Sequence, residues 1–149
     1  MQDWLWMTAG DLGRGIAAGE IDPVVLTETY LDALEAHPLT PRIYARLTPD
    51  RARAEAQAAK ARAAVGRRLS PLDGVPISWK DLFDTTGVVT EAGSALLKGR
   101  VPDRDADVLR MATAAGLVCL GKTHMSELAF SGLGYNPITE TSPCVNDPD

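Results

Sequence analysis

Cysteine, aromatic residues and long apolar runs are all scarce in this sequence of 149 residues. Two cysteines, Cys119 and Cys144, are too few for a disulfide framework. Aromatic residues make up 5%, so a hydrophobic core has to consist mainly of Ala, Leu and Val. No apolar run is longer than the four residues of Leu117–Leu120, which excludes a membrane-spanning helix, and the acidic start leads into no signal-type stretch. We therefore expect a cytoplasmic protein that spans no membrane.

Basic residues are also in deficit. The sequence has 15 Lys+Arg against 20 Asp+Glu, which gives a formal net charge of -5. Because an acidic surface repels nucleic acid and anionic lipid, neither is expected as a direct partner. The 45% of hydrophobic and 23% of charged residues are typical of a globular chain, and the length is that of about one domain.

Caps, prolines and apolar spacing predict three helices and a strand in the first part of the chain. The Ala-rich stretch is the clearest helix because alanine has the highest helix propensity. The expected elements are a helix from Thr8 to Gly19, a helix from Asp22-Pro23 to Pro38, a strand over Ile43–Leu47 and a helix over Arg51–Val65 begun by Thr48-Pro49-Asp50.

The second part of the chain predicts a strand, a helix and a strand. Val75–Trp79 and Leu117–Leu120 are short apolar runs typical of buried strands. Between them, Asp103 or Asp105 can cap a helix that Gly116 ends. Such a unit places its two strands side by side and parallel, so the expected fold class is α/β.

One motif matches in letters only. Gly116–Thr123 fits the phosphate-binding pattern G-x-x-x-x-G-K-[ST], which requires a strand, a flexible loop and then a helix. Here a predicted helix precedes Gly116, and the four middle residues form an apolar run that favours a strand. We therefore reject a phosphate loop, and a nucleotide-binding titration would test that decision.

Lys80 is the side chain with the clearest chemical potential. It closes the predicted strand Val75–Trp79, and the carboxyl ends of strands in α/β sheets face the usual binding crevice. An ammonium held there against apolar walls would have a lowered pKa, so the neutral amine could act as a general base. Position alone favours the alternative, a lysine in water or paired with Asp81 or Asp84.

The other candidate residues give weaker evidence of a function. Cys144 and His124 could form a nucleophile and base, although nothing in the sequence brings them together. The glycine-rich stretch 127–137 could line a pocket or merely connect two elements. No spacing of His, Cys and Asp resembles a metal site. The arginines near the end of the Ala-rich helix are better explained as a solvated helix end than as an anion site: Arg62, Arg67 and Arg68.

Three stretches taken together resemble the amidase signature enzymes: Leu72–Asp84, Ala115–Thr123 and Glu127–Gly132. That family includes amidases and the A subunit of the tRNA-dependent glutamine-forming amidotransferase. The resemblance implies an α/β/α fold with helices packed on a mixed sheet, here expected to be incomplete. Residues 1–149 would be the amino-terminal portion of a single domain, with a mainly helical lead-in over 1–68 and the start of the α/β core over 69–149.

The resemblance also implies a chemistry. Members of the family hydrolyse amides with a Ser-cisSer-Lys triad, in which Lys80 matches the lysine that deprotonates the bridging serine. The stretch with Ser131 and Gly132 resembles a pocket-lining segment, which makes these two candidate substrate-binding residues. Lys122 follows the second apolar strand in the family pattern without being the base. No cofactor is implied, and the expected partner is a small-molecule amide.

The sequence departs from the family in one respect. No Gly-Gly-Ser-Ser-like segment, which would carry both serines, occurs in the 149 residues. We therefore expect the amino-terminal portion of a longer amidase, inactive alone and prone to self-association through an incomplete sheet. The alternatives are the ammonia-generating component of a tRNA-dependent amidotransferase and a non-catalytic remnant or interaction module.

Overall fold

The computed structural model describes residues 4–144 and 146. Contacts between residues divide the chain into two compact units that alternate along the sequence. The first unit comprises Met1–Ala36, Thr48–Ile77 and Met111–Leu120, and the second comprises His37–Leu47, Ser78–Arg110 and Gly121–Asp149. The expected division at residue 68 stays a prediction.

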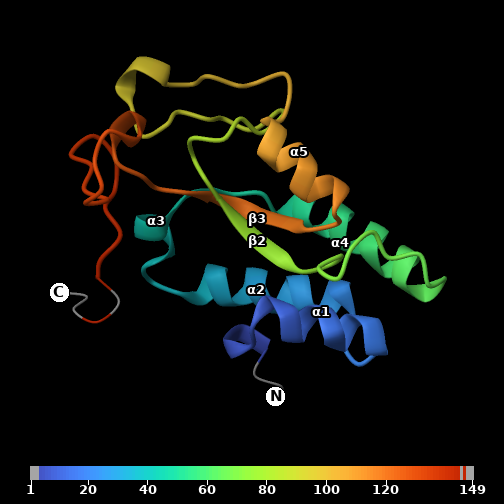
Figure 1. Cartoon of the computed structure of the whole chain (residues 1–149). Helices are drawn as coiled ribbons and strands as arrows, with labels where there is room; N and C mark the ends of the chain where they lie inside the picture. Colours follow the sequence, from blue (N-terminus) through green and yellow to red (C-terminus); the bar gives the residue numbers. More distant parts are fainter. Residues whose placement is uncertain (1–3, 145, 147–149) are drawn as a thin grey trace. The chain divides into compact units, whose positions relative to one another are not determined.

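Two capped helices open the first unit after a short 3-10 turn at Trp4–Trp6 (Figure 1). Helix α1 spans Ala9–Ala18; the Thr8 hydroxyl accepts a hydrogen bond from the Asp11 N–H, and Gly19 ends the helix at φ 75°. Helix α2 spans Pro23–Ala36 and begins where the Asp22 carboxylate accepts from the Val24 N–H at 2.8 Å. Both predicted starts are confirmed, because capping depends only on neighbouring residues.

Helix α4 spans Pro49–Ala64, as predicted, but one detail of its start was wrong. Thr48 stands at the capping position without a side-chain capping bond. Its hydroxyl donates instead to the Cys119 carbonyl at 2.9 Å. The cap is lost because a strand remote in sequence offers the buried hydroxyl another acceptor.

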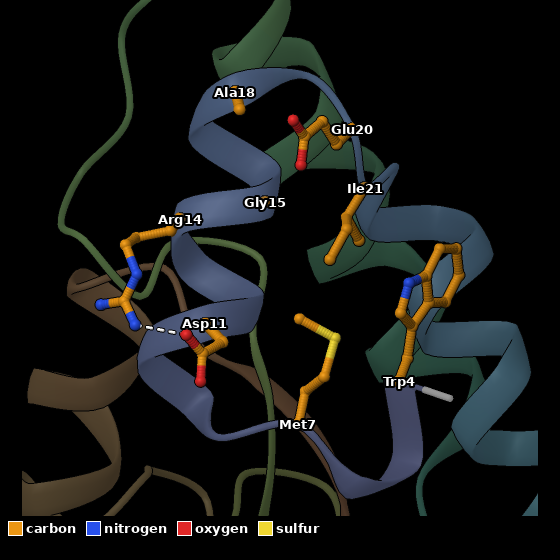
Figure 2. Close-up of a pocket in the computed structure, with 8 residues that line it drawn as sticks. All are labelled: Trp4, Met7, Asp11, Arg14, Gly15, Ala18, Glu20 and Ile21. Atoms are coloured by element: carbon orange, nitrogen blue, oxygen red, sulfur yellow. Dashed lines mark hydrogen bonds and ion pairs between the residues drawn. The ribbon is translucent and has the colours of Figure 1, made fainter. Parts of the chain in front are cut away.

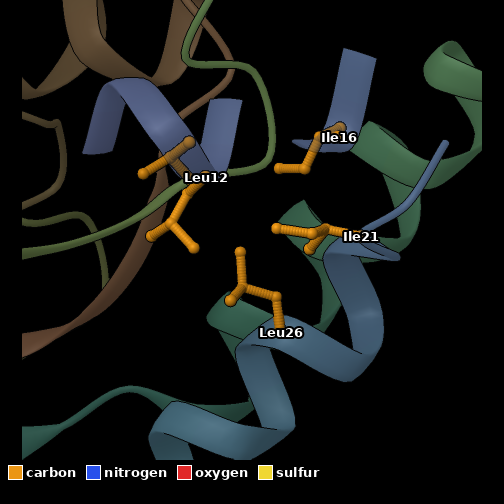
Figure 3. Packing of buried hydrophobic residues seen from close by; sticks show 5 residues of the cluster. Leu12, Ile16, Ile21 and Leu26 are labelled. Carbon is orange, nitrogen blue, oxygen red and sulfur yellow. The ribbon is translucent and has the colours of Figure 1, made fainter. Parts of the chain in front are cut away.

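The hydrophobic core of the first unit consists of two clusters. Leu12, Ile16, Ile21 and Leu26 converge between α1 and α2, together with Val75 (Figure 3). The second cluster contains Leu31, Ala52, Ala56, Val118 and Leu120. The small alanines let α4 approach α2 closely, and the core is aliphatic, as the scarcity of aromatic residues implied.

The sheet has the strand order β1-β3-β2, with β1 at Tyr44–Leu47, β2 at Pro76–Lys80 and β3 at Val118–Thr123. Strand β1 is antiparallel to β3 and places Arg46 opposite Lys122. The bonds from the Val118 N–H to the Val75 carbonyl and from the Asp81 N–H to the Thr123 carbonyl, both 3.0 Å, advance together along β2 and β3. These two strands are therefore parallel, and the expected mixed sheet is confirmed.

Strand β3 is longer than predicted, because it continues through Gly121-Lys122-Thr123. The phosphate-loop alternative fails on this point, since those residues pair with β1 instead of forming a loop.

Two further expectations were wrong in detail. A short helix α3, Thr40–Ile43, takes the first residue of the predicted strand, since Pro41 favours a helical turn there. Helix α5 spans Asp107–Ala114, later than the predicted caps, and the Asp105 carboxylate accepts from the Thr86 N–H at 2.7 Å. The remaining 3-10 turns are Ala95–Leu97 and Glu127–Ala129. Among the described helices, none combines the length and the apolar character needed to cross a bilayer.

Candidate active site

Lys80 is the last residue of β2, where the sequence predicted it. Side chains alternate along a strand, so Lys80 lies on the face opposite Trp79, which is buried against Phe83 with ring centroids 5.7 Å apart. Lys80 itself is exposed. The apolar enclosure expected around the ammonium is therefore not supplied by the residues that the structure describes.

Of the two ordinary explanations of Lys80, the exposed side chain fits a lysine in water, whereas no described contact pairs it with Asp81 or Asp84. Asp84 forms a two-pronged pair with Arg100 at 2.6 and 2.7 Å, and the hydrogen bonds from this guanidinium hold the pKa of Asp84 below its ordinary value. Asp81 pairs with Arg46 and Lys122. Within the described contacts, both carboxylates that could take Lys80 are used by other cations.

Ser78, on the same face of β2 as Lys80, forms a pair of hydroxyl groups with Tyr44 of β1. Ser78 lies two residues before Lys80, and its Oγ hydrogen-bonds with the Tyr44 hydroxyl. Gly121 leaves room for the tyrosine, because a Cβ there would lie 3.1 Å from Tyr44 Cδ1 and 2.6 Å from the Arg46 carbonyl. The pair was not predicted from the sequence, because Tyr44 and Ser78 lie 34 positions apart and no local pattern signals their contact.

Next to the end of β2 lies a cluster of charges, of which Asp81 and Lys122 are buried and Arg46 and Glu91 are partly exposed. Lys122 is fully buried and donates to Asp81 Oδ1 at 3.2 Å and to the Thr90 hydroxyl at 2.8 Å. Arg46 reaches the same Asp81 oxygen at 3.1 Å. We call Arg46, Asp81, Glu91 and Lys122 the charge cluster. The burial of Lys122 was not predicted from the sequence, although a lysine two residues after the apolar run Leu117–Leu120 was the available signal.

Glu91 completes the charge cluster. Its Oε2 pairs with Arg46 at 2.9 Å, and its Oε1 accepts from the Gly99 N–H at 2.7 Å. The Gly99 hydrogen bond and the Arg46 charge outweigh desolvation and hold the pKa of Glu91 below its ordinary value. A cavity of about 130 Å³ adjoins the cluster, with Arg46, Asp81, Glu91 and His124 among its lining residues.

The predicted substrate-binding residues lie in an exposed loop. The Ser131 carbonyl accepts from the Ser126 hydroxyl at 2.9 Å, and the Ser131 hydroxyl accepts from the Leu133 N–H at 3.2 Å. Gly132 is exposed, with open space where a Cβ would stand. No described contact joins Ser131 or Gly132 to Lys80, so their role in substrate binding stays a prediction.

Asn136 anchors this loop. It is 2% exposed, and its amide donates to the carbonyls of Gly93 and Met125, both at 2.8 Å. Its Oδ1 accepts from the backbone of Ile138 and Thr139 at 2.9 and 3.2 Å. The glycine-rich stretch is thus a loop held by the hydrogen bonds of Asn136. Its role in lining a pocket stays a prediction.

Other sequence candidates are accounted for structurally. His124 Nε2 contacts the Pro41 carbonyl at 3.2 Å, and Cys144 is exposed, with no described contact between the two side chains. Arg62 is not part of a solvated helix end, as the sequence predicted, because it binds both oxygens of the buried Asp73 at 2.9 and 2.6 Å and is not free for an anion. No group of three or more His, Cys, Asp or Glu that could hold a metal occurs among the described residues.

A wider hollow of about 600 Å³ lies in the first unit (Figure 2). Asp11 and Arg14, the charged pair on its wall, bind each other. Besides that pair the lining carries one further carboxylate, Glu20, and no Ser, Cys, His or Lys, so we do not take the hollow as the candidate active site: Trp4, Met7, Asp11, Arg14, Gly15, Ala18, Glu20 and Ile21.

Fold and site together define an α/β chain with a mixed sheet and an exposed lysine at the carboxyl end of its second strand. The family model described as Amidase matches residues 25–148. This chain belongs to the Amidase family.

The relatives agree with that assignment. The A subunit of glutamyl-tRNA(Gln) amidotransferase from Anaeromyxobacter dehalogenans is 43% identical over 136 residues, which cover 91% of this chain and 27% of that protein. The solved structure of native peptide amidase from Stenotrophomonas maltophilia matches with a TM-score of 0.82 and 32% identity, over 95% of this chain and 30% of that one. The chain thus spans less than a third of the length of these relatives.

Proposed function

We propose that this chain supplies the general base, Lys80, to an enzyme that cleaves amide bonds through a Ser-cisSer-Lys mechanism. The supporting observation is the position of Lys80 at the exposed carboxyl end of β2, within the Amidase match. Its exposure leaves the amine accessible to groups that the described residues do not include.

The chemistry assigns one proton transfer to Lys80. The neutral amine takes a proton from the bridging serine, which in turn takes the proton of the nucleophilic serine as that oxygen attacks the amide carbonyl. The C–N bond breaks, the leaving amine takes up a proton, and water then releases the acyl group from the serine. Because the 149 residues contain no Gly-Gly-Ser-Ser segment, both serines have to come from outside them.

A second candidate is the generation of ammonia for a tRNA-dependent amidotransferase. The observation in its favour is the 43% identity to a protein named as the A subunit of glutamyl-tRNA(Gln) amidotransferase. The two candidates share Lys80 as base and differ in the amide, since an amidotransferase takes the amide of glutamine and passes the ammonia on. The choice of substrate therefore separates them.

The first experiment measures ammonia released by the 149-residue chain from simple aliphatic and aromatic amides and from glutamine. We expect none. The second grafts residues 25–148 in place of the matched region of the Anaeromyxobacter protein and repeats the assay. Ammonia from either kind of amide would show that this segment supplies a working base, whereas the amide that the graft prefers reflects the Anaeromyxobacter residues that make up the rest of it.

Lys80→Ala in the graft is expected to lower kcat at least about 10³-fold, the usual effect of removing a triad member. Lys98→Ala, which removes an exposed lysine of the same unit, is the matched control and should retain activity. Turnover that survives Lys80→Ala would contradict the assignment of the base. Ammonia from the ungrafted chain would contradict the missing nucleophile.

A further inference from the structure

The surface around Trp6 carries both a protruding aromatic side chain and the hollow of about 600 Å³. We propose that this surface joins two copies of the chain, with Trp6 of each copy in the hollow of the other. The inference goes beyond the proposed function and does not depend on it. Trp6 and the lining residues all belong to the first unit and precede residue 25, so the graft of residues 25–148 does not contain them.

Trp6 is a large apolar side chain that lies almost entirely in water. It is 85% exposed, whereas Trp79 is buried against Phe83. A docked tryptophan buries about 150–250 Å² of surface, so its exposure leaves a large apolar area without a contact. Its neighbours Leu5 and Met7 are also exposed. Consecutive exposed apolar residues mark interaction surfaces, and tryptophan is a frequent anchor of protein interfaces.

The hollow adjoins Trp6 along the chain. Trp4 and Met7, which flank Trp6, are part of its lining, and Ile21 adds a further apolar wall (Figure 2). The volume is within the range of about 300–1,000 Å³ of pockets that bind drug-sized ligands, so an indole ring fits. The protruding ring and the hollow therefore lie on one surface, which is the condition for two copies to bind each other by a two-fold contact.

The hollow also matches the polar part of an indole. A tryptophan side chain is apolar except for its Nε1–H, which donates one hydrogen bond and accepts none. Arg14, the one cation among the described lining residues, is paired with Asp11. Glu20 also lines the hollow, and its carboxylate has no partner within the described contacts. We therefore assign Glu20 of the other copy as the acceptor for the Trp6 Nε1–H.

A second copy is favoured as the occupant because one surface supplies both halves of the contact. In a two-fold dimer each copy inserts one tryptophan and receives the other, so the contact forms twice and the assembly closes. The two rings and the walls that they cover bury roughly 800 Å² in total. Stable interfaces bury about 1,200–2,000 Å², so we expect a weak dimer with a Kd on the order of 10–100 µM.

The test is sedimentation velocity of the 149-residue chain over a concentration range that spans this Kd. All samples carry Phe130→Ser/Leu133→Ser, which removes association through that loop. We expect a monomer–dimer equilibrium without larger species. Trp6→Ser should raise Kd at least about 30-fold, as expected for an interface anchor. Val65→Ser, which removes an exposed apolar side chain of the same unit outside the hollow, is the matched control and should leave Kd unchanged.

Two further variants test the hollow itself. Ala18→Trp fills it from an exposed position of the lining and should raise Kd as much as Trp6→Ser does. Ala58→Trp, at an exposed position of α4, is its control. Glu20→Ala removes the proposed acceptor and should raise Kd about tenfold. Glu35→Ala, at an exposed position of α2, is the control for that loss of charge.

Photo-crosslinking identifies the contact directly. A benzophenone amino acid at position 6, in a mixture of unlabelled and isotope-labelled chains, should crosslink to residues 7–21 of the differently labelled copy. A chain that stays monomeric over the whole concentration range would overturn the inference and leave the hollow to another partner. A dimer that Trp6→Ser and Ala18→Trp leave unchanged, with circular dichroism showing the parent fold, would also overturn it.

Discussion

The two units of this chain are stabilised by different interactions. The first unit buries aliphatic side chains, such as Leu12, Ile16 and Leu26, in continuous clusters. The second buries mainly polar and charged groups, including Asp81, Lys122 and Asn136, whose hydrogen bonds and ion pairs are directional. The candidate base belongs to the second unit.

This difference separates stability from precision. Apolar burial provides free energy in proportion to area and tolerates changes of shape. A buried polar network adds little net free energy when complete, but it specifies one geometry and is costly to break. We therefore expect substitutions in the first unit to lower global stability, and substitutions in the second to disturb local geometry. Four predictions test this comparison.

The largest loss of stability is expected from Leu26→Ala in the first unit. Leu26 is 0% exposed, so truncation leaves a cavity and should cost about 3 kcal/mol in the free energy of unfolding. Urea denaturation followed by circular dichroism measures it. Val25→Ala is the matched control. Val25 is the exposed neighbour of Leu26, so its truncation should change the free energy of unfolding by less than about 0.5 kcal/mol. Equal losses of stability in the two variants would contradict the view that apolar burial stabilises the first unit.

Asn136→Ala tests the second unit. It leaves the carbonyls of Gly93 and Met125 without their donor, a cost of about 1–3 kcal/mol. Hydrogen exchange should show lost protection over residues 125–139, with little change in α1 and α2. Asn146→Ala removes the other asparagine, which is exposed, and serves as control. Uniform loss of protection across the chain would show that this loop is not a separate local structure.

Asp73→Asn tests a buried acid of the first unit. Burial by itself would raise its pKa, but hydrogen bonds from Arg62 and the Leu69 N–H hold the pKa below the ordinary 3.8. The ionised carboxylate therefore stabilises the folded chain above that pH, and the contribution is lost as pH falls through the lower folded value. We expect the variant to be less stable by about 2 kcal/mol at pH 7.

The difference between Asp73→Asn and the parent should shrink as unfolding is measured at successively lower pH from about 5 downward. Asp32→Asn, at an exposed position of α2, is the control and should show no such convergence. A gap that widens with acid would mean that the carboxylate is destabilising in the folded chain.

The smallest effect on stability is expected from Phe130→Ser/Leu133→Ser in the second unit. Both side chains are 89% exposed, so the free energy of unfolding should change by less than about 0.5 kcal/mol. The same variant should self-associate less, as measured by sedimentation velocity, if these side chains drive the predicted association. Val65→Ser, at an exposed position of the first unit, is the comparison. An unchanged sedimentation profile would assign association to another surface.

Predictions from the sequence held where the interactions are local. The caps at Thr8 and Asp22 were correct because each involves residues two or three positions apart. The position of Lys80 was correct because five residues of strand pattern precede the lysine. Errors arose where a remote partner intervened. The Thr48 hydroxyl does not cap α4, because it donates to the carbonyl of Cys119, 71 positions away.

The sequence by itself determined the helices α1, α2 and α4, the strand that presents Lys80 and the family, since these depend on propensities, caps and short local motifs. Only the tertiary structure decided that Lys122 is buried, that Arg46 and Lys122 share Asp81, and that Tyr44 meets Ser78. The physical reason is that a buried charge is tolerated only beside its counter-charge. Here the counter-charge of the buried Lys122 is Asp81, which directly follows β2, and Arg46, which shares that carboxylate, lies 35 positions from it in the chain.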